Sequence, residues 1–125
     1  MSNIICSFVD FVFINEIQQM NSGESPILKA SGVWKRINAV EKPVYQSNVK
    51  QNDAGPTTEE TITVKAKQNN LVELLIQYCG YNTVLKIGTY TGDIFYVGNL
   101  EYPCSLEFTS DKIFDNYTFK AISPV

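Results

Sequence analysis

Histidine is absent from this chain of 125 residues, and cysteine is scarce, with only Cys6, Cys79 and Cys104 present. General acid–base catalysis most often uses His, which is also a common metal ligand. The cysteines are odd in number and lack CxxC spacing, so they predict buried, reduced thiols of an intracellular protein rather than a disulfide framework. The phosphate-binding patterns GxGxxG and GKS/T are missing too. The sequence therefore predicts no enzyme, with no catalytic, cofactor-binding or metal-ligating residues.

Charge is also low, at 18% Asp, Glu, Lys and Arg, with a net charge of −3. A nucleic-acid-binding domain usually shows a basic patch and a high isoelectric point, whereas the value here is about 4.9. Lys35 and Arg36, beside Trp34, make the one basic cluster, which we interpret as a solvated strand end. No nucleic-acid partner is expected.

The longest apolar run, residues 4–14, is too short to span a bilayer as a helix and is interrupted by Asp10. It also lacks the basic start and the cleavage site of a signal peptide, so we expect no membrane partner and a cytoplasmic location before any assembly. The run predicts a strand that is apolar on both faces, and therefore central or covered by a partner subunit. Asp10 should be paired or near an edge, because a lone buried carboxylate is costly. The two apolar rows are Ile5, Val9, Phe11 and Phe13, and Ile4, Phe8, Val12 and Ile14.

The next part of the chain contains few apolar positions. Residues 21–26 have turn composition, and residues 27–37 predict a second strand with a bulge or bend at Gly32. Residues 38–58 are mostly polar and contain Pro43, Gly55 and Pro56, which predicts a long flexible loop. A loop of this length is either functional or disordered, and residues 46–58 should be mobile because they lack an apolar anchor.

From residue 60 onward the hydrophobic pattern is regular. Residues 60–67 alternate, with Ile62, Val64 and Ala66 predicted to face inward. Residues 70–79 have helical spacing of apolar positions, between a candidate Asn cap and a glycine. The remaining predicted strands are residues 83–89 and 93–99, joined as a hairpin at 90–92, then 104–109 and 117–122.

These elements predict a mainly β fold of the α+β type. We expect one domain over residues 1–125, forming an antiparallel β-sandwich or small barrel of about seven strands with one covering α-helix.

Several carboxylates and aromatic residues are candidates for a catalytic, metal-binding or sugar-binding site. Glu59 and Glu60 are adjacent and should face opposite sides of a strand, while Asp111 and Asp115 lack the spacing of a calcium loop. We interpret these carboxylates as surface charges. A further group could stack on sugars, although packing in the core or an interface is favoured because aromatic residues dominate both. This group is Trp34, Tyr81, Tyr90, Tyr96 and Tyr102.

Residues 62–122 carry a recognisable order of elements: a strand, a short amphipathic helix, the hairpin TVLKIGTYTGDIFYVGN, the strand SLEF, an acidic turn and the closing strand NYTFKAI. This pattern resembles small tail or head–tail structural proteins of phages and prophages. The resemblance implies a virion subunit that self-assembles, often into rings, with no catalytic residues to carry over.

The sequence thus predicts a homo-oligomer that associates through sheet edges and its apolar first strand, with other structural proteins as partners. A Lys at Phe11 or Phe13, whichever faces outward, should disrupt that association. Two alternatives remain. A carbohydrate- or ligand-binding β-module requires exposed aromatic residues along one groove and predicts a monomer or two-fold dimer. An enzyme requires two carboxylates converging in a pocket.

Overall fold

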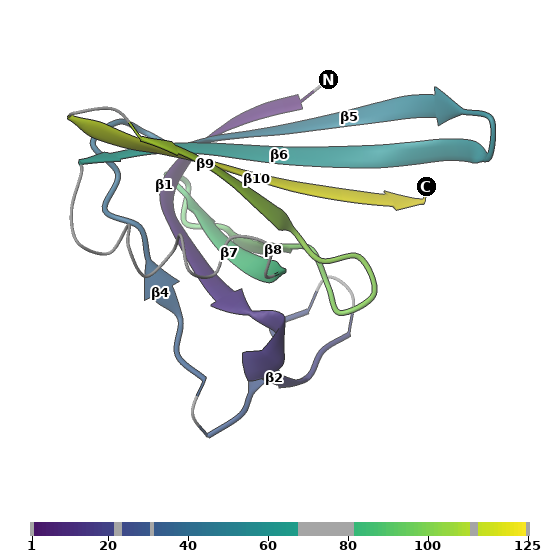
Figure 1. The fold of residues 1–125 in the computed structure, drawn as a ribbon, viewed down its shortest axis with the longest axis horizontal. Coiled ribbons are helices and arrows are strands. Elements are labelled where there is room, and N and C mark those ends of the chain that lie inside the picture. Colours follow the sequence, from purple (N-terminus) through teal and green to yellow (C-terminus); the bar gives the residue numbers. More distant parts are fainter. Residues whose placement is uncertain (1, 22–23, 31, 68–81, 111–112, 125) are drawn as a thin grey trace.

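The computed structural model describes residues 2–21, 24–30, 32–67, 82–110 and 113–124. Eight strands form one strongly curled antiparallel sheet with the order β8-β7-β1-β5-β6-β10-β9, and β4 pairs with β1 beside this path (Figure 1). A short 3-10 helix, η1 (Ile14–Glu16), precedes a separate ribbon of β2 (Ile17–Gln19) and β3 (Ile27–Leu28). The sheet strands are β1 (Ser2–Phe13), β4 (Lys35–Arg36), β5 (Val44–Asn52), β6 (Gly55–Lys67), β7 (Thr83–Thr89), β8 (Ile94–Val97), β9 (Ser105–Ser110) and β10 (Phe114–Pro124).

Strand β1 links the two halves of the curl. Its residues 2–5 pair with β5, whereas its residues 6–13 pair with β7, and a bulge separates Cys6 from Phe8. A bulge adds one residue to a strand and so exchanges the faces to which its side chains point. Before the bulge Ile4 packs on the core and Ile5 is 48% exposed, while after it Val9 is buried. The predicted row of Ile5 with Val9 is therefore wrong.

The main core fills the inside of the curl. Large side chains from strands far apart in sequence meet there, including Phe11 of β1 and Phe119 of β10, whose ring centroids are 6.1 Å apart. The alternation predicted for residues 60–67 is confirmed, because Ile62, Val64 and Ala66 are all buried in this core. Further core residues are Leu85, Ile87, Val97, Leu106 and Tyr117.

A second, smaller core covers the outer side of β1. Val12 and Val84 are fully buried there and pack with Ile17, partly covered by Leu28 and Trp34. β1 pairs on both of its sides, and its residues 9–13 are buried within the chain, whereas Ile5 is 48% exposed. Of the two alternatives predicted for this strand, the structure shows the central position. Phe11 and Phe13 are both buried, so the expectation that one of them faces outward is wrong.

The hairpin of β7 and β8 and the strands β9 and β10 occur where the sequence predicts them. The antiparallel, mainly β class is therefore confirmed, in the form of a curled half-barrel. The helix predicted over residues 70–79 lies outside the described residues. Among the residues that the structure describes, no helix is long and apolar enough to cross a membrane.

The single strand predicted over residues 27–37 is wrong. Only β3 and β4 form, and they pair with different strands, β2 and β1. Between them the chain turns, since the Gly32 N–H donates to the Lys29 carbonyl at 2.8 Å. A Cβ on Gly32 would lie 2.8 Å from the Glu16 carbonyl oxygen, so the glycine permits this close return toward η1.

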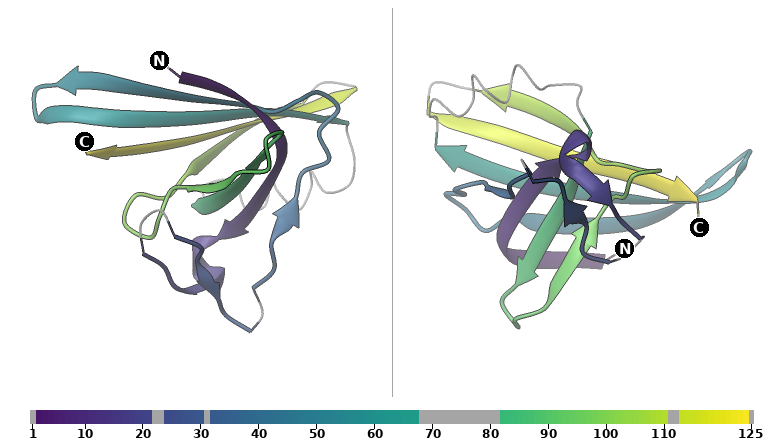
Figure 2. Two further views of the ribbon diagram at one scale, coloured as in Figure 1. Left: turned by 180° about the vertical axis from the view of Figure 1, so that it is seen from behind. Right: turned by 90° about the horizontal axis from the view of Figure 1, so that it is seen from below.

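The loop predicted over residues 38–58 is wrong from residue 44 onward. β5 and β6 form a long hairpin whose outer half extends away from the curl, with β10 running along part of it (Figures 1 and 2). We call residues 48–58 of this hairpin the arm. The tight turn at Asp53 and Ala54 ends at Gly55, whose φ of 115° suits glycine. The arm is polar because neither of its faces packs on the core.

Candidate functional site

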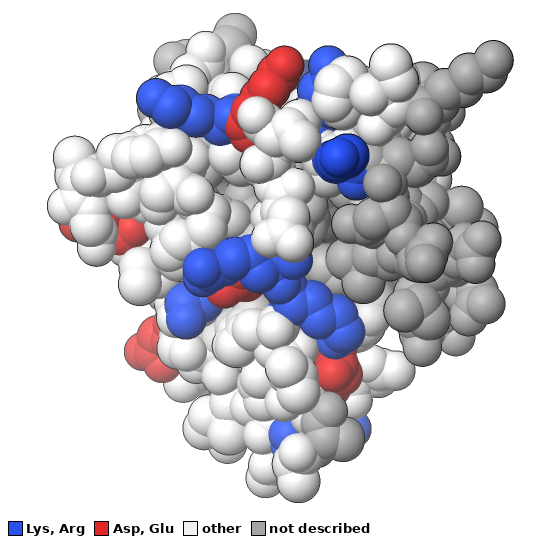
Figure 3. Space-filling view, turned by 90° about the vertical axis from the view of Figure 1, so that its left-hand side faces the viewer, with Lys and Arg blue, Asp and Glu red and all other residues white. Residues whose placement is uncertain are grey.

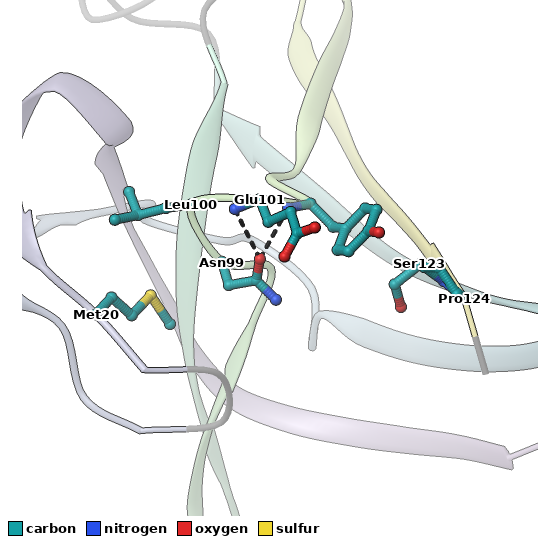
Figure 4. A pocket seen from close by; sticks show the side chains of 7 residues that line it. Met20, Asn99, Leu100, Glu101, Ser123 and Pro124 are labelled. Carbon is teal, nitrogen blue, oxygen red and sulfur yellow. Dashed lines mark hydrogen bonds between the residues drawn. The ribbon is translucent and has the colours of Figure 1, made fainter.

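Three surface features could carry a function, and the first is a hollow at one end of the curl (Figure 4). Two adjoining cavities, of about 360 and 220 Å³, share Asn99, Tyr102 and Ser123 in their lining. We treat them together as the end hollow. The larger cavity is also lined by Met20, Leu100, Glu101 and Pro124, and the smaller by Glu60, Tyr96, Gly98 and Ala121.

The loop that borders the end hollow is held in a defined shape. The Asn99 side-chain oxygen accepts hydrogen bonds from the N–H groups of Glu101 (2.9 Å) and Tyr102 (2.8 Å), as in an Asx turn. Gly98, with φ of 85°, lies so close to Cys104 that a Cβ would approach its sulfur to 3.0 Å. Cys104 and Thr83 then exchange two backbone hydrogen bonds, of 2.8 and 2.9 Å, which join the start of β7 to the residue before β9.

The end hollow carries negative charge. Among the described residues, its lining contains the carboxylates of Glu60 and Glu101 and no Lys or Arg. The Tyr45 hydroxyl donates a hydrogen bond of 2.7 Å to Glu60, and burial together with this bond raises the pKa of Tyr45 to about 12. Neither carboxylate forms an ion pair with any residue that the structure describes. A cationic group could therefore enter the hollow and neutralise them.

The second feature is a row of polar side chains across four neighbouring strands. The register places Arg36, Asp10, Lys86 and Tyr96 side by side on β4, β1, β7 and β8. Arg36 donates two hydrogen bonds to the nearly buried Asp10 carboxylate, at 2.7 and 3.2 Å. The expectation that Asp10 is paired is therefore confirmed. Lys86 makes no ion pair within the described residues.

Beside this row is another cavity, of about 380 Å³, lined by Phe8, Arg36, Lys42, Glu41 and Tyr90 among others. The Lys42 ammonium lies 5.0 Å from the centre of the Tyr90 ring. Lys and Arg side chains form a band across this side of the molecule (Figure 3). We call the surface around the cavity the cationic face; its charged residues are Arg36, Lys42, Lys65 and Lys86, with the carboxylates Asp10 and Glu41.

The third feature is the free edge of the arm. Strand β1 pairs with β5 only up to Ser47, so residues 48–52 are paired on one side alone within the described part of the chain. Val49, on this edge, is 63% exposed. Lys50 also lies on the edge, but its ammonium is bound to the Glu59 carboxylate at 2.8 Å.

The acidic residues singled out from the sequence have different environments. Glu59 and Glu60 face opposite sides of β6 as expected, because Glu59 binds Lys50 and Lys120 while Glu60 faces Tyr45. The interpretation of Asp115 as a surface charge is wrong. The Asp115 side chain is fully buried. Burial of Tyr117, together with the nearby Asp115 carboxylate, raises the pKa of Tyr117 to about 12. Asp111 lies outside the described residues.

The basic cluster is more than a solvated strand end. Both residues lie on the short strand β4, but each binds a carboxylate: Arg36 binds Asp10, and Lys35 binds Glu16 at 2.6 Å. The cysteine prediction is confirmed for Cys6 and Cys104, which are free and buried, and burial raises the pKa of both thiols. Cys79 lies outside the described residues. Within the described part, no group of three His, Cys, Asp or Glu side chains could hold a metal.

The aromatic residues do not form one platform. Tyr96 and Tyr102 line the end hollow, whereas Tyr90 lines the cavity of the cationic face. The Trp34 ring packs on Tyr96, with a centroid distance of 6.2 Å. Tyr81 lies outside the described residues. Glu60 and Glu101, which sequence reasoning did not bring together, line different parts of the end hollow rather than meeting at one point.

No protein-family model, curated protein or solved structure matches this chain. The function must therefore be argued from the three surfaces themselves.

Proposed function

We propose that the chain is a non-enzymatic structural subunit that self-associates through its sheet edges, as small phage tail or head–tail proteins do. The arm supports this proposal most directly. It extends a hydrogen-bonded hairpin beyond the core (Figure 1), and none of the residues 48–58 belongs to either core cluster. A strand edge of this kind can pair with a strand of another chain.

The composition of the arm edge also favours pairing. Monomeric proteins commonly protect a strand edge with an unpaired Lys. Here the Lys50 ammonium is not free, because it is paired with Glu59 at 2.8 Å, a carboxylate that also binds Lys120 at 3.4 Å. The exposed side chains of Val49 on β5 and Ile122 on β10 add apolar surface that a neighbouring subunit could bury.

The test compares Val49→Lys with Val33→Lys, because both valines are 63% exposed and only Val49 lies on the arm. We expect the wild-type chain to form rings, tubes or smaller oligomers, detected by mass photometry and negative-stain imaging. Val49→Lys should weaken association by about tenfold or more, whereas Val33→Lys should leave it unchanged.

A wild-type chain that stays monomeric at every concentration, or forms only a two-fold dimer unaffected by Val49→Lys, would contradict the assembly proposal. The second result would favour the alternative of a ligand-binding module, because such a module has no need of the arm edge.

A further inference from the structure

We propose that the subunits associate head to tail, with the cationic face of one copy seated beneath the arm of the next, against its end hollow. This inference rests on the proposed assembly function and names the two surfaces that meet. A contact between two different surfaces of the same chain closes into a ring or continues into a filament, depending on its rotation.

The cavity of the cationic face and the end hollow share no lining residue and lie on different sides of the molecule. Strand β4, which carries Arg36, is on the left in Figure 1, while the connection from β8 to β9 and the C-terminal end of β10 are on the right. The end hollow is bordered by that connection and by Ser123 and Pro124 of β10. Both surfaces can therefore be occupied at once, as a chain of subunits requires.

The end hollow also adjoins the arm. The register aligns Val49 of β5 with Thr58 of β6, and Thr58 with Ser123 of β10, so Val49 and Ser123 lie on the same face of the sheet. A neighbouring copy in the end hollow would therefore contact the inner side of the arm. This placement explains how the arm edge and the hollow can belong to one interface.

The charges of the two surfaces are complementary. Glu60 and Glu101 line the hollow without an ion pair in the described part of the chain, and Lys42 and Lys86 are cations without one. On the cationic face, the four Lys and Arg side chains outnumber the carboxylates of Asp10 and Glu41. Such complementarity orients two partners and disfavours contacts between like surfaces.

Each surface also offers apolar or aromatic area. Tyr90 is 61% exposed beside Lys42, and Ile94 is exposed at the start of β8. The end hollow contributes Met20, Leu100 and Tyr102 (Figure 4). Exposed aromatic and aliphatic side chains supply the central burial of an interface, and the charged residues then set its direction.

A charge-exchange experiment tests the contact. Glu101→Lys replaces one of the two carboxylates of the hollow with an ammonium, and Lys42→Glu replaces one of the four cations of the cationic face with a carboxylate. Each variant alone should raise the dissociation constant by about tenfold to a hundredfold, measured by sedimentation velocity. An equal mixture of the two should regain association, because every junction then joins groups of opposite charge.

Matched controls carry the same charge changes elsewhere. Glu24→Lys and Lys29→Glu, before and after β3, alter exposed side chains that line neither surface, so they should leave association unchanged. Circular dichroism should be unchanged in all four variants, since each altered side chain is exposed. Association should also weaken as the ionic strength rises.

The possible results separate this inference from the proposed function. If the wild-type chain assembles but Glu101→Lys and Lys42→Glu assemble equally well, the head-to-tail contact is refuted and the assembly proposal stands. If each variant fails alone and the mixture does not recover, the two surfaces are not partners. A wild-type monomer at every concentration would overturn both proposals.

Discussion

The curl and the arm share the strands β5 and β6, yet they differ in what their side chains do. In the curl, Tyr45 of β5 and Ile62 of β6 lie side by side with Phe119 of β10, and all three are buried in the core. In the arm, the same ladder continues with the exposed Val49 and the polar, half-buried Thr58. Backbone hydrogen bonding is therefore alike in the two regions, and only the curl is stabilised by burial.

Truncation of a buried ring should reveal the largest difference between the two regions. Phe119 is 1% exposed and packs on Phe11, so Phe119→Ala should lower the free energy of unfolding by about 3–5 kcal/mol. Val49→Ala in the arm should change it by less than about 0.5 kcal/mol. Urea denaturation followed by fluorescence measures both. Equal losses at the two positions would show that the arm contributes to the same packed core.

Two glycines give a second comparison. A Cβ on Gly88 would lie 2.2 Å from the Phe8 ring, and the Arg36 guanidinium also lies over this ring, 4.3 Å from its centre. Gly88→Ala should therefore cost about 1–3 kcal/mol through overpacking. Gly55 at the arm turn has no atom within 4 Å of such a Cβ, so Gly55→Ala should cost only about 1 kcal/mol of backbone strain at φ 115°.

The double variant Gly88→Ala with Phe8→Leu tests whether overpacking against the Phe8 ring causes the loss of stability in Gly88→Ala. The smaller side chain makes room for the new methyl group, so the pair should be less destabilised than the two single losses added together. Additive losses, measured by the same urea denaturation, would mean that the Phe8 ring is not what excludes a side chain at residue 88.

The smallest expected difference in stability is between the glutamine variants of two glutamates, Glu16 and Glu59. Partial burial of Glu16 is outweighed by hydrogen bonds from Lys35 and from the backbone N–H groups of Phe13 and Val33, so its pKa is lowered from the usual 4.5. A carboxyl with a lowered pKa stabilises the fold above its unfolded-state pKa, and that stability is lost as the pH falls through the folded-state value. Glu16→Gln should cost about 1–2 kcal/mol at neutral pH, and the difference should shrink below about pH 4.5.

Glu59 is the matched control on the hairpin. Hydrogen bonds from Lys50 and Lys120 lower its pKa despite some desolvation, but both partners are exposed. Glu59→Gln should therefore cost less than about 0.5 kcal/mol at neutral pH. Thermal unfolding of both variants between pH 3 and 7 checks the pair. An equal or larger loss for Glu59→Gln would contradict the view that the ion pairs of Glu59 with Lys50 of the arm and Lys120 of β10 contribute little to stability.

Sequence patterns predicted β6, β7, β8, β9 and β10 because each has one row of apolar residues that must face a core. They failed for β5, whose arm half has no buried face and so no hydrophobic period. The turn residues Asn52, Asp53, Ala54 and Gly55 were the available signal for the hairpin. Local turn chemistry was thus more informative there than hydrophobicity.

The surfaces were less predictable than the strands. Glu60 and Glu101 are far apart in the chain and line one hollow only because the sheet curls. Asp115 is buried because the ladder places it opposite Ala66, on the core side of β10. Lys42 and Arg36 border one cavity for a similar reason, since β4 and the following loop return along β1.

The amino-acid sequence by itself determined the mainly β class. It narrowed the first strand to a central or partner-covered position, and Asp10 to a paired or edge position, because burial and desolvation act on every residue wherever it lies. Only the tertiary structure decided that the polar middle of the chain forms an arm, that a bulge exchanges the faces of β1, and which charges share a surface. These features depend on strand register and sheet curvature, which arise from contacts between residues far apart in sequence.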